Sequence, residues 1–441
     1  MYLADSRGSK APAAPDNGLR PGRRVAAVPG TVLALGAVSL ITDISSEMVT
    51  AVLPLYVVAA LGLSPLGFGL LDGINNGVGA LVRLAGGHLA DRGGRQHKAV
   101  AGIGYGLSAL CKPLLLLAHT LPVISAVLAL DRTGKGLRTA PRDAMISLST
   151  PPERLGRAFG VHRAMDTTGA LLGPLVAFAV LRFTVDGYDA VFAVSGCVAA
   201  LGVLVLVLFV PRQVASRRHA PDAPGPHTSP PDPAGSGSPE PRATLRDSVA
   251  LLRRPALRRL TVCAVLLGLT TVSDSFLYLL LQRELRLPVH LFPLLPLGTA
   301  AAFLLLAVPM GAVADRVGRR GLFLAGHGFL LLAYGLVLLA SRNAGTSVVV
   351  AVLILHGAFY AATDGVLAAA TARVVPPQHL GAGQALVGTG QALARFVCSL
   401  GFGAAWTLWG GRTALAVTAA ALVAAAVAAS FVLRTADEVP V

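Results

Sequence analysis

Apolar runs about 20 residues long recur along the chain from Val28 to Leu433. A run of this length forms a helix that crosses the roughly 30 Å hydrocarbon core of a bilayer. We count about twelve such runs, separated by shorter polar connections. Hydrophobic residues make up 54% of the chain and charged residues 13%, a balance that soluble globular proteins rarely reach. The sequence therefore predicts an all-α membrane protein with twelve transmembrane helices.

The basic residues lie in alternate connections between these runs. A net charge of +15 suggests nucleic-acid binding in a soluble protein, but here it follows the positive-inside pattern, so we expect no nucleic-acid partner. The pattern predicts a multi-pass protein of the bacterial inner (plasma) membrane with both termini cytoplasmic. The connections assigned to the cytoplasm hold Arg20, Arg23 and Arg24, then Arg92, Arg95 and Lys98, then Arg154 and Arg157, and then Arg316, Arg319 and Arg320.

A Pro-, Gly- and Ser-rich segment separates two groups of six runs. Its composition cannot bury a core and predicts a flexible linker, followed by a basic segment that we expect to lie on the anionic inner leaflet. The predicted divisions are an N-terminal cytoplasmic tail (1–27), a first six-helix half (28–210), a cytoplasmic linker with the basic segment (211–259), a second six-helix half (260–433) and a C-terminal cytoplasmic tail (434–441).

The two halves repeat each other. The segment GHLADRGGR, which begins at Gly87, recurs as GAVADRVGR 224 positions later, at Gly311. Similarly, PPERLG at Pro151 recurs as PPQHLG at Pro376, 225 positions later. Two motifs at nearly the same offset indicate a duplicated six-span unit. Duplicated transporters place their substrate site between the halves, near the middle of the membrane.

The repeated element GxLADRxGR resembles the signature loop of the major facilitator superfamily. This resemblance implies twelve helices in two pseudo-symmetric halves, and it implies a cytoplasmic latch whose carboxylates and arginines pair in one conformation only. A second interpretation is that these residues only anchor a turn and follow the charge rule. The latch residues implied are Gly87, Asp91, Arg92 and Arg95 in the first half, and Gly311, Asp315, Arg316 and Arg319 in the second.

Two further motifs resemble elements of the same superfamily. RTGKG, from Arg132, is similar to the fourth-span arginine motif of proton-coupled facilitators, although Lys135 stands where Gln is more common. GALLGP, with Gly169, Gly173 and Pro174, is similar to a motif of its antiporters. Small residues and a proline kink at this place would let helices close one side of a cavity. Ordinary close helix packing is the alternative.

The fourth predicted span carries charges on one helical face. At 100° per residue Asp131, Lys135, Arg138 and Arg142 share an arc, with Arg132 at its edge. Charges at this depth are costly unless they pair or line a wet cavity, so we predict a cavity wall. In the alternative, Asp131 and Asp143 only neutralise the basic groups. A phosphate loop is excluded, because the required Gly and Ser or Thr positions hold Ala129 and Gly136.

Two carboxylates, Asp43 and Glu47, lie one turn apart in the first span. Close carboxylates in a low dielectric disfavour double ionisation, so one of them can exchange a proton. We predict Asp43 as the proton-coupling acid, Glu47 as the second choice and Arg132 as the cation that holds the carboxylate charged. Glu47 facing lipid headgroups is the alternative.

Polar residues of other spans complete the predicted substrate cavity. His162, Arg163 and Asp166 share an arc of the fifth span, and the second half adds Asp274, Asp364 and Arg395. In the second span, Asp72, Asn75 and Asn76 are further candidates to line the path, with Asp72 at the outer rim as the alternative. The four cysteines lie in apolar segments without ligand spacing, so no metal or other cofactor is expected. The predicted substrate cavity comprises Asp131, Lys135, Arg138, His162, Arg163, Asp166, Asp274, Asp364 and Arg395.

These features predict a monomeric secondary transporter whose partners are a small-molecule substrate, protons and the lipid bilayer. The prediction is proton-driven efflux, by antiport, of a small amphiphilic or anionic compound. A proton-coupled importer of a nutrient or metal chelate would use the same residues. A non-transporting membrane receptor has less need of two latch loops. The sequence shows no nucleophile with a base at a recognisable spacing, so we do not expect an enzyme.

Overall fold

The computed structural model describes residues 28–92, 97–151, 154–185, 187–211, 251–317, 319–340, 345–375 and 380–434. Within these ranges the chain is almost entirely helical and contains no strand. The predicted N-terminal tail, most of the linker with its basic surface segment, Arg95 and most of the C-terminal tail lie outside the described residues.

Six long helices form the first half and seven the second. The first half contains α1 (Gly30–Leu55), continued by the short η1 (Tyr56–Ala60), α2 (Pro65–Arg92), α3 (His97–Leu114), α4 (Leu121–Ser149), α5 (Leu155–Phe183) and α6 (Gly187–Phe209). The second half contains α8 (Pro255–Gly268), α9 (Asp274–Leu285), α10 (Leu294–Val317), α11 (Arg319–Leu339), α12 (Thr346–Val374), α13 (Leu380–Trp409) and α14 (Gly411–Arg434). Since α8 and α9 are two pieces of one interrupted span, the described residues form twelve spans, as predicted.

Nine of these helical segments are long and apolar enough to cross a membrane by length and composition, among the residues described. The spans that miss this criterion are α2, α4 and the α8–α9 pair. The helices α2 and α4 carry several charged residues, and α8 and α9 are each shorter than 18 residues. A span departs from uniform apolarity only where it faces protein or a wet cavity, so these spans should line the site.

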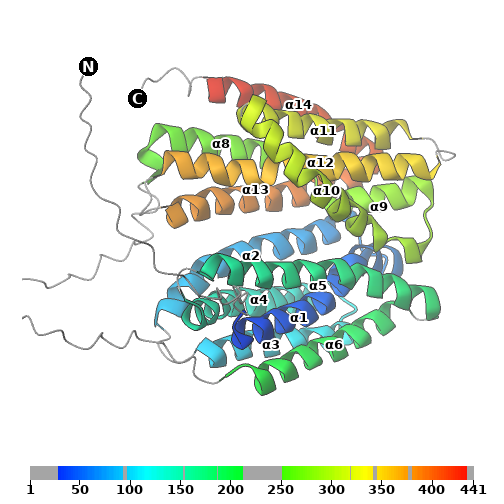
Figure 1. Ribbon diagram of the computed structural model, residues 1–441. Coiled ribbons are helices and arrows are strands. Elements are labelled where there is room, and N and C mark those ends of the chain that lie inside the picture. The colour runs from blue at the N-terminus through cyan, green and yellow to red at the C-terminus, as the bar shows by residue number, and fades with distance from the viewer. Residues whose placement is uncertain are drawn as a thin grey trace, which may run out of the picture.

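The helices fall into two groups side by side, α1–α6 and α8–α14 (Figure 1). The start of α1 and the end of α14 lie at the same end of the bundle (Figure 1), as an even number of crossings requires. Arg258 and Arg259, which the sequence placed in the linker, belong to the first turns of α8. Outward-facing apolar side chains such as Leu305 and Val308, 77% and 80% exposed, suit contact with lipid.

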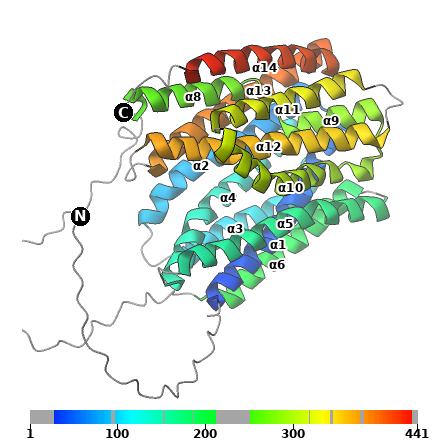
Figure 2. The ribbon, with the colours of Figure 1, turned by 45° about the horizontal axis from the view of Figure 1, so that its top comes forward.

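The halves touch at the end of the bundle away from the chain ends. The backbone N–H of Leu66 in α2 donates to Thr407 Oγ1 in α13 at 3.1 Å. The rings of Phe178 in α5 and His290 in η5 (Val289–Leu291) lie 6.0 Å apart, centroid to centroid. Toward the other end the ribbons of the two halves spread apart (Figure 2). Two halves that touch at one end are the geometry of alternating access around a central site.

The glycines of GALLGP bring α5 against α1. A Cβ on Gly169 would overlap the carbonyl oxygen of Leu40, and one on Gly173 would lie 2.6 Å from Glu47 Cβ and 2.8 Å from the Ile44 carbonyl oxygen. Such approach is open only to residues without a side chain. Close packing thus accounts for both glycines in the conformation described here.

We expect Gly173→Ala to destabilise the protein by about 1 to 3 kcal/mol, because the added methyl group forces α1 and α5 apart. Gly160→Ala, on the same helix but with nothing within 4 Å of the added Cβ, is the matched control and should gain about 0.5 to 1 kcal/mol in helix propensity. Thermal unfolding of the two detergent-purified variants checks the prediction. Equal midpoints would contradict it.

Candidate functional site

Asp131 on α4 is enclosed by α3 rather than exposed to a large cavity. Its carboxylate accepts from Lys112 Nζ at 2.9 Å and from Ser108 Oγ at 2.5 Å. Both charged side chains are at least 96% buried. Asp131 lines only a small cavity of about 30 Å³, so its geometry fits the neutralising role that was the alternative for this residue. Sequence reasoning missed Lys112, since it stands alone in an apolar run.

We expect Lys112→Met to cost about 3 to 5 kcal/mol, because it removes the cation that hydrogen-bonds to the buried Asp131 carboxylate and leaves only Arg132, 3.8 Å away. The double variant Lys112→Met/Asp131→Leu removes both charges and should recover most of that loss. Thermal unfolding in detergent measures both. A single variant as stable as the unaltered protein would show that the buried pair contributes nothing.

The predicted coupling acid, Asp43 of α1, faces two other cations of α4. Arg138 Nη2 donates to Asp43 Oδ1 at 3.3 Å, and Lys135 Nζ lies 3.8 Å from the same oxygen. Lys135 also lies 3.9 Å from Glu47 Oε1. The predicted partner Arg132 instead lies 3.8 Å from Asp131, and its buried Nε has no hydrogen-bond partner among the described residues. The guanidinium of Arg138 is held over the Tyr105 ring at 4.5 Å.

A second ion cluster joins α4 to α5. Arg142 contacts Asp143 at 3.0 Å and Asp166 at 3.7 Å. Asp166 and Asp43 line the same cavity. His162 is buried and reaches Ser39 Oγ at 3.1 Å, so it supports the cluster from behind. Carboxyl groups from two helices therefore meet among the basic residues of α4.

These side chains enclose a cavity of about 370 Å³ within the first half, which we call the basic cavity. Five cationic side chains and two carboxylates line it, so cations predominate on its wall, although Arg132, Lys135 and Arg142 also contact Asp131, Glu47 and Asp143 at 3.8, 3.9 and 3.0 Å. An excess of cations in a partly enclosed site favours an anionic ligand. The lining residues are Asp43, Asn75, Arg132, Lys135, Gly136, Arg138, Thr139, Arg142, Arg163 and Asp166.

The break between α8 and α9 positions a different set of groups. The helix stops at Gly268 and restarts at Asp274, which is the first residue of α9. Asp274 Oδ1 accepts from Tyr360 Oη at 2.6 Å and lies 3.0 Å from His356 Nε2, both on α12. Broken helices of this kind expose backbone and short side chains to a cavity in the membrane. The sequence offered no periodicity signal for the break.

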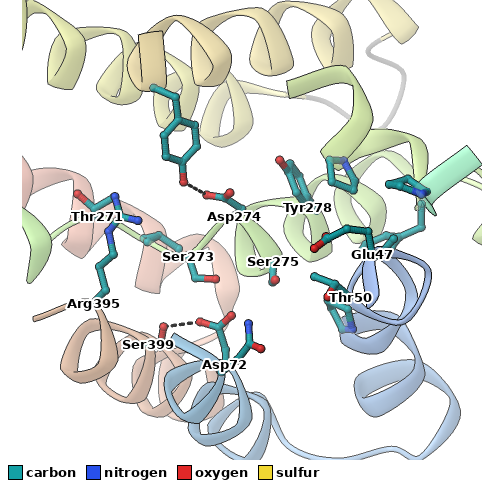
Figure 3. Close-up of a pocket in the computed structure, with 18 residues that line it drawn as sticks. Glu47, Thr50, Asp72, Thr271, Ser273, Asp274, Ser275, Tyr278, Arg395 and Ser399 are labelled. Atoms are coloured by element: carbon teal, nitrogen blue, oxygen red, sulfur yellow. Dashed lines mark hydrogen bonds between the residues drawn. The ribbon is translucent and has the colours of Figure 1, made fainter. Parts of the chain in front are cut away.

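A second cavity, of about 240 Å³, lies where the two halves face each other, and we call it the acidic cavity. Glu47, Asp72 and Asp274 extend toward it from α1, α2 and α9 (Figure 3). Among the described residues, Arg395 is the one cation that lines it, against these three carboxylates. The hydroxyl of Ser399 on α13 donates to Asp72 at 2.6 Å and so links the halves. Asn75 lines both cavities.

The comparisons with known proteins agree with this geometry. The family model of the Major Facilitator Superfamily matches residues 35–306 and 260–441. The chain belongs to the major facilitator superfamily. An uncharacterized MFS-type transporter from Methanocaldococcus jannaschii is 27% identical over 315 residues, which covers 69% of this chain and 70% of that one. An uncharacterized protein of Mycobacterium tuberculosis is 34% identical over 176 residues, 40% of each chain.

Solved structures of other facilitators share the fold. The nucleoside transporter NupG superposes with a TM-score of 0.73 at 13% identity, over 91% of this chain and 99% of that one. A peptide transporter in complex with sulfate gives a TM-score of 0.71 at 16% identity, over 93% and 94%. A bacterial homolog of the human lysosomal transporter Spinster gives 0.70 at 16% identity, over 92% and 96%. At these identities the likeness shows the fold alone.

The predicted fold, family and membrane class are thereby confirmed: this facilitator is a transporter, not an enzyme. The structure brings most of the predicted cavity residues to one of the two cavities, but as two separate sets. It places Arg316 as exposed, and it leaves a Cβ on Gly311 without a neighbour within 4 Å. For the remaining predicted residues the structure describes the helix backbone but not the side chain. These residues are Gly87, Asp91, Arg92, Asp315, Arg319 and Asp364.

No group of three metal-ligating side chains occurs among the residues that the structure describes. The cysteines of this facilitator are all free, and Cys111, Cys263 and Cys398 are buried.

Proposed function

We propose that this facilitator moves a small anionic compound across the inner membrane together with a proton, by alternating access around the basic cavity. The observation that carries the proposal is the pairing of Asp43 with Arg138 and Lys135 in a cavity that holds more cations than carboxylates. The same residues that would bind the anion are neutralised by the acid that would bind the proton. We also propose that both chain ends are cytoplasmic, as the positive-inside pattern predicts.

Electrostatic linkage sets the sign of the coupling. When Asp43 is ionised, it occupies the charge of Arg138 and Lys135, so a substrate anion has to compete with it. When Asp43 takes up a proton, both cations become available to the anion. By thermodynamic reciprocity the bound anion favours the protonated acid to the same extent. Proton and anion therefore bind together, which supports symport. With an inward proton gradient, symport means import.

Antiport is the second candidate, and the GALLGP motif on α5 favours it. In antiport the substrate and the proton have to exclude each other. A cationic or amphiphilic substrate would satisfy that condition by pairing with Asp43 and Asp166 in place of the proton. The substrate charge and the direction of coupling are therefore linked, and one assay can test both.

The decisive experiment uses purified protein in proteoliposomes that contain a lumenal pH dye. The lumen is loaded with one member of a panel of small carboxylates and phosphonates, and the membrane potential is clamped with K⁺ and valinomycin. Outward flow of the anion by symport carries protons out and makes the lumen more alkaline. Acidification of the lumen would contradict symport and indicate antiport. Saturable binding without any flux would indicate a receptor. Protein-free liposomes control for leakage.

A further inference from the structure

The two cavities carry opposite charge and lie next to each other. Five cations against two carboxylates line the basic cavity, whereas three carboxylates against one cation line the acidic cavity. We infer that the substrate is dipolar: its anionic group binds in the basic cavity and a cationic amine or quaternary ammonium group binds in the acidic cavity. This inference names the substrate class of the proposed transport site and rests on that proposal.

The separation of the cavities fits a small molecule. Asp43 lines the basic cavity and Glu47 the acidic one, and both are on α1. One helical turn of four residues sets them about 6 Å apart along the axis. Lys135 lies between them, 3.8 Å from Asp43 and 3.9 Å from Glu47. A compound with three or four atoms between its charged groups would span this distance.

The acidic cavity has further features that suit an organic cation. Tyr278, Tyr360 and Phe292 contribute aromatic rings to its wall, and aromatic faces attract ammonium groups. Among the described residues, Glu47 has one cationic partner, Lys135, at 3.9 Å. Asp274, already oriented by Tyr360 and His356, retains acceptor capacity on its carboxylate. Carboxylates that are held in place bind an amine without reorganisation.

Because the acidic cavity lies between the two halves, the cationic group of the substrate would contact both halves when they are close together. Glu47 and Asp72 belong to the first half, whereas Asp274 and Arg395 belong to the second. A cation between the carboxylates of Glu47 and Asp274 attracts both halves at once, while an anion in the basic cavity contacts the first half alone. The cationic group of the substrate would thus be the one that draws the halves together.

The test compares three probes of one size: 3-aminopropylphosphonate, propylphosphonate and propylamine. Apparent affinities come from the concentration dependence of the thermal unfolding midpoint of the purified full chain. We expect the dipolar probe to bind at least about tenfold more tightly than propylphosphonate, the equivalent of one added charge contact. Asp274→Asn should reduce this advantage and leave propylphosphonate binding within about twofold. Glu47→Gln, which also frees Lys135 from a carboxylate 3.9 Å away, should reduce the ratio between the two affinities. Asp189→Asn, the same change at an exposed position, should alter neither.

The outcomes separate this inference from the proposed function. Equal affinities for the two phosphonates would overturn the dipolar substrate and leave anion transport standing. Tighter binding of propylamine than of propylphosphonate would overturn both. If neither phosphonate stabilises the protein, the proposed anion site fails and the inference fails with it.

A chemical readout covers the case in which the charge variants do not fold. In a Cys197→Ser background, Ser275→Cys places a thiol in the acidic cavity and Thr139→Cys places one in the basic cavity. A trimethylammonium methanethiosulfonate should modify Ser275→Cys at least about tenfold faster than the sulfonate reagent does, and Thr139→Cys should show the reverse preference. The same preference at both positions would overturn the inference.

Discussion

Asp43→Asn is expected to abolish proton-driven accumulation while it preserves exchange of the substrate. Asn keeps the size of the side chain but cannot take up a proton, so an imposed pH gradient no longer does work on the substrate. The accumulation ratio in proteoliposomes should fall to about one at any pH gradient, because no coupling free energy remains. Counterflow, which needs only substrate binding and alternating access, should continue.

The same variant should bind an anionic substrate more tightly. In the unaltered protein Asp43 lies 3.3 Å from Arg138 and 3.8 Å from Lys135, and the loss of its charge leaves both cations to the substrate. Asp189→Asn is the matched control, since Asp189 is exposed at the start of α6. Proton-driven accumulation that survives in Asp43→Asn would show that another acid carries the proton. Asp166, which lines the same cavity as Asp43, would then be the next residue to replace.

The sequence predicted the architecture well because apolar runs about 20 residues long identify membrane-spanning helices. It also found the charged face of α4 and the acid on α1, since both follow from helical periodicity. It could not predict which charges meet. The acid Asp43 contacts Arg138, six residues beyond the predicted partner Arg132, and this difference corresponds to about 9 Å along the helix. Which of these two arginines pairs with Asp43 depends on the relative axial positions of α1 and α4.

The division of the site into two cavities could likewise not be predicted from the sequence. Asp131 looks like a cavity residue by its depth in the membrane, yet Lys112 and Ser108 of α3 enclose it. The break between α8 and α9 occurs at Leu269–Ser273, a short run with no proline or glycine. That break places Asp274 at a helix start, opposite α12. Contacts between residues on different helices, such as these, depend on tertiary packing, which no local pattern encodes.

Arg138→Gln is expected to weaken binding of the anionic substrate, whereas Asp43→Asn is expected to strengthen it. The variant removes a buried guanidinium that both pairs with Asp43 and stacks on Tyr105. Loss of a charge-assisted contact in a buried site costs about 2 to 3 kcal/mol, which corresponds to a rise in KM of about 30- to 150-fold. Initial rates in proteoliposomes at several substrate concentrations measure this effect.

Two controls separate recognition from stability. Arg138→Lys keeps the charge but loses the planar fork that fits carboxylate and phosphate, so its KM should lie between those of Arg138→Gln and the unaltered protein. Arg182→Gln, an exposed position near the end of α5, should leave KM unchanged. The double variant Asp43→Asn/Arg138→Gln should bind the anion more weakly than Asp43→Asn alone, because it has one cation instead of two. If Arg138→Gln lowers the maximal rate and leaves KM intact, Arg138 supports the helices and does not bind the substrate.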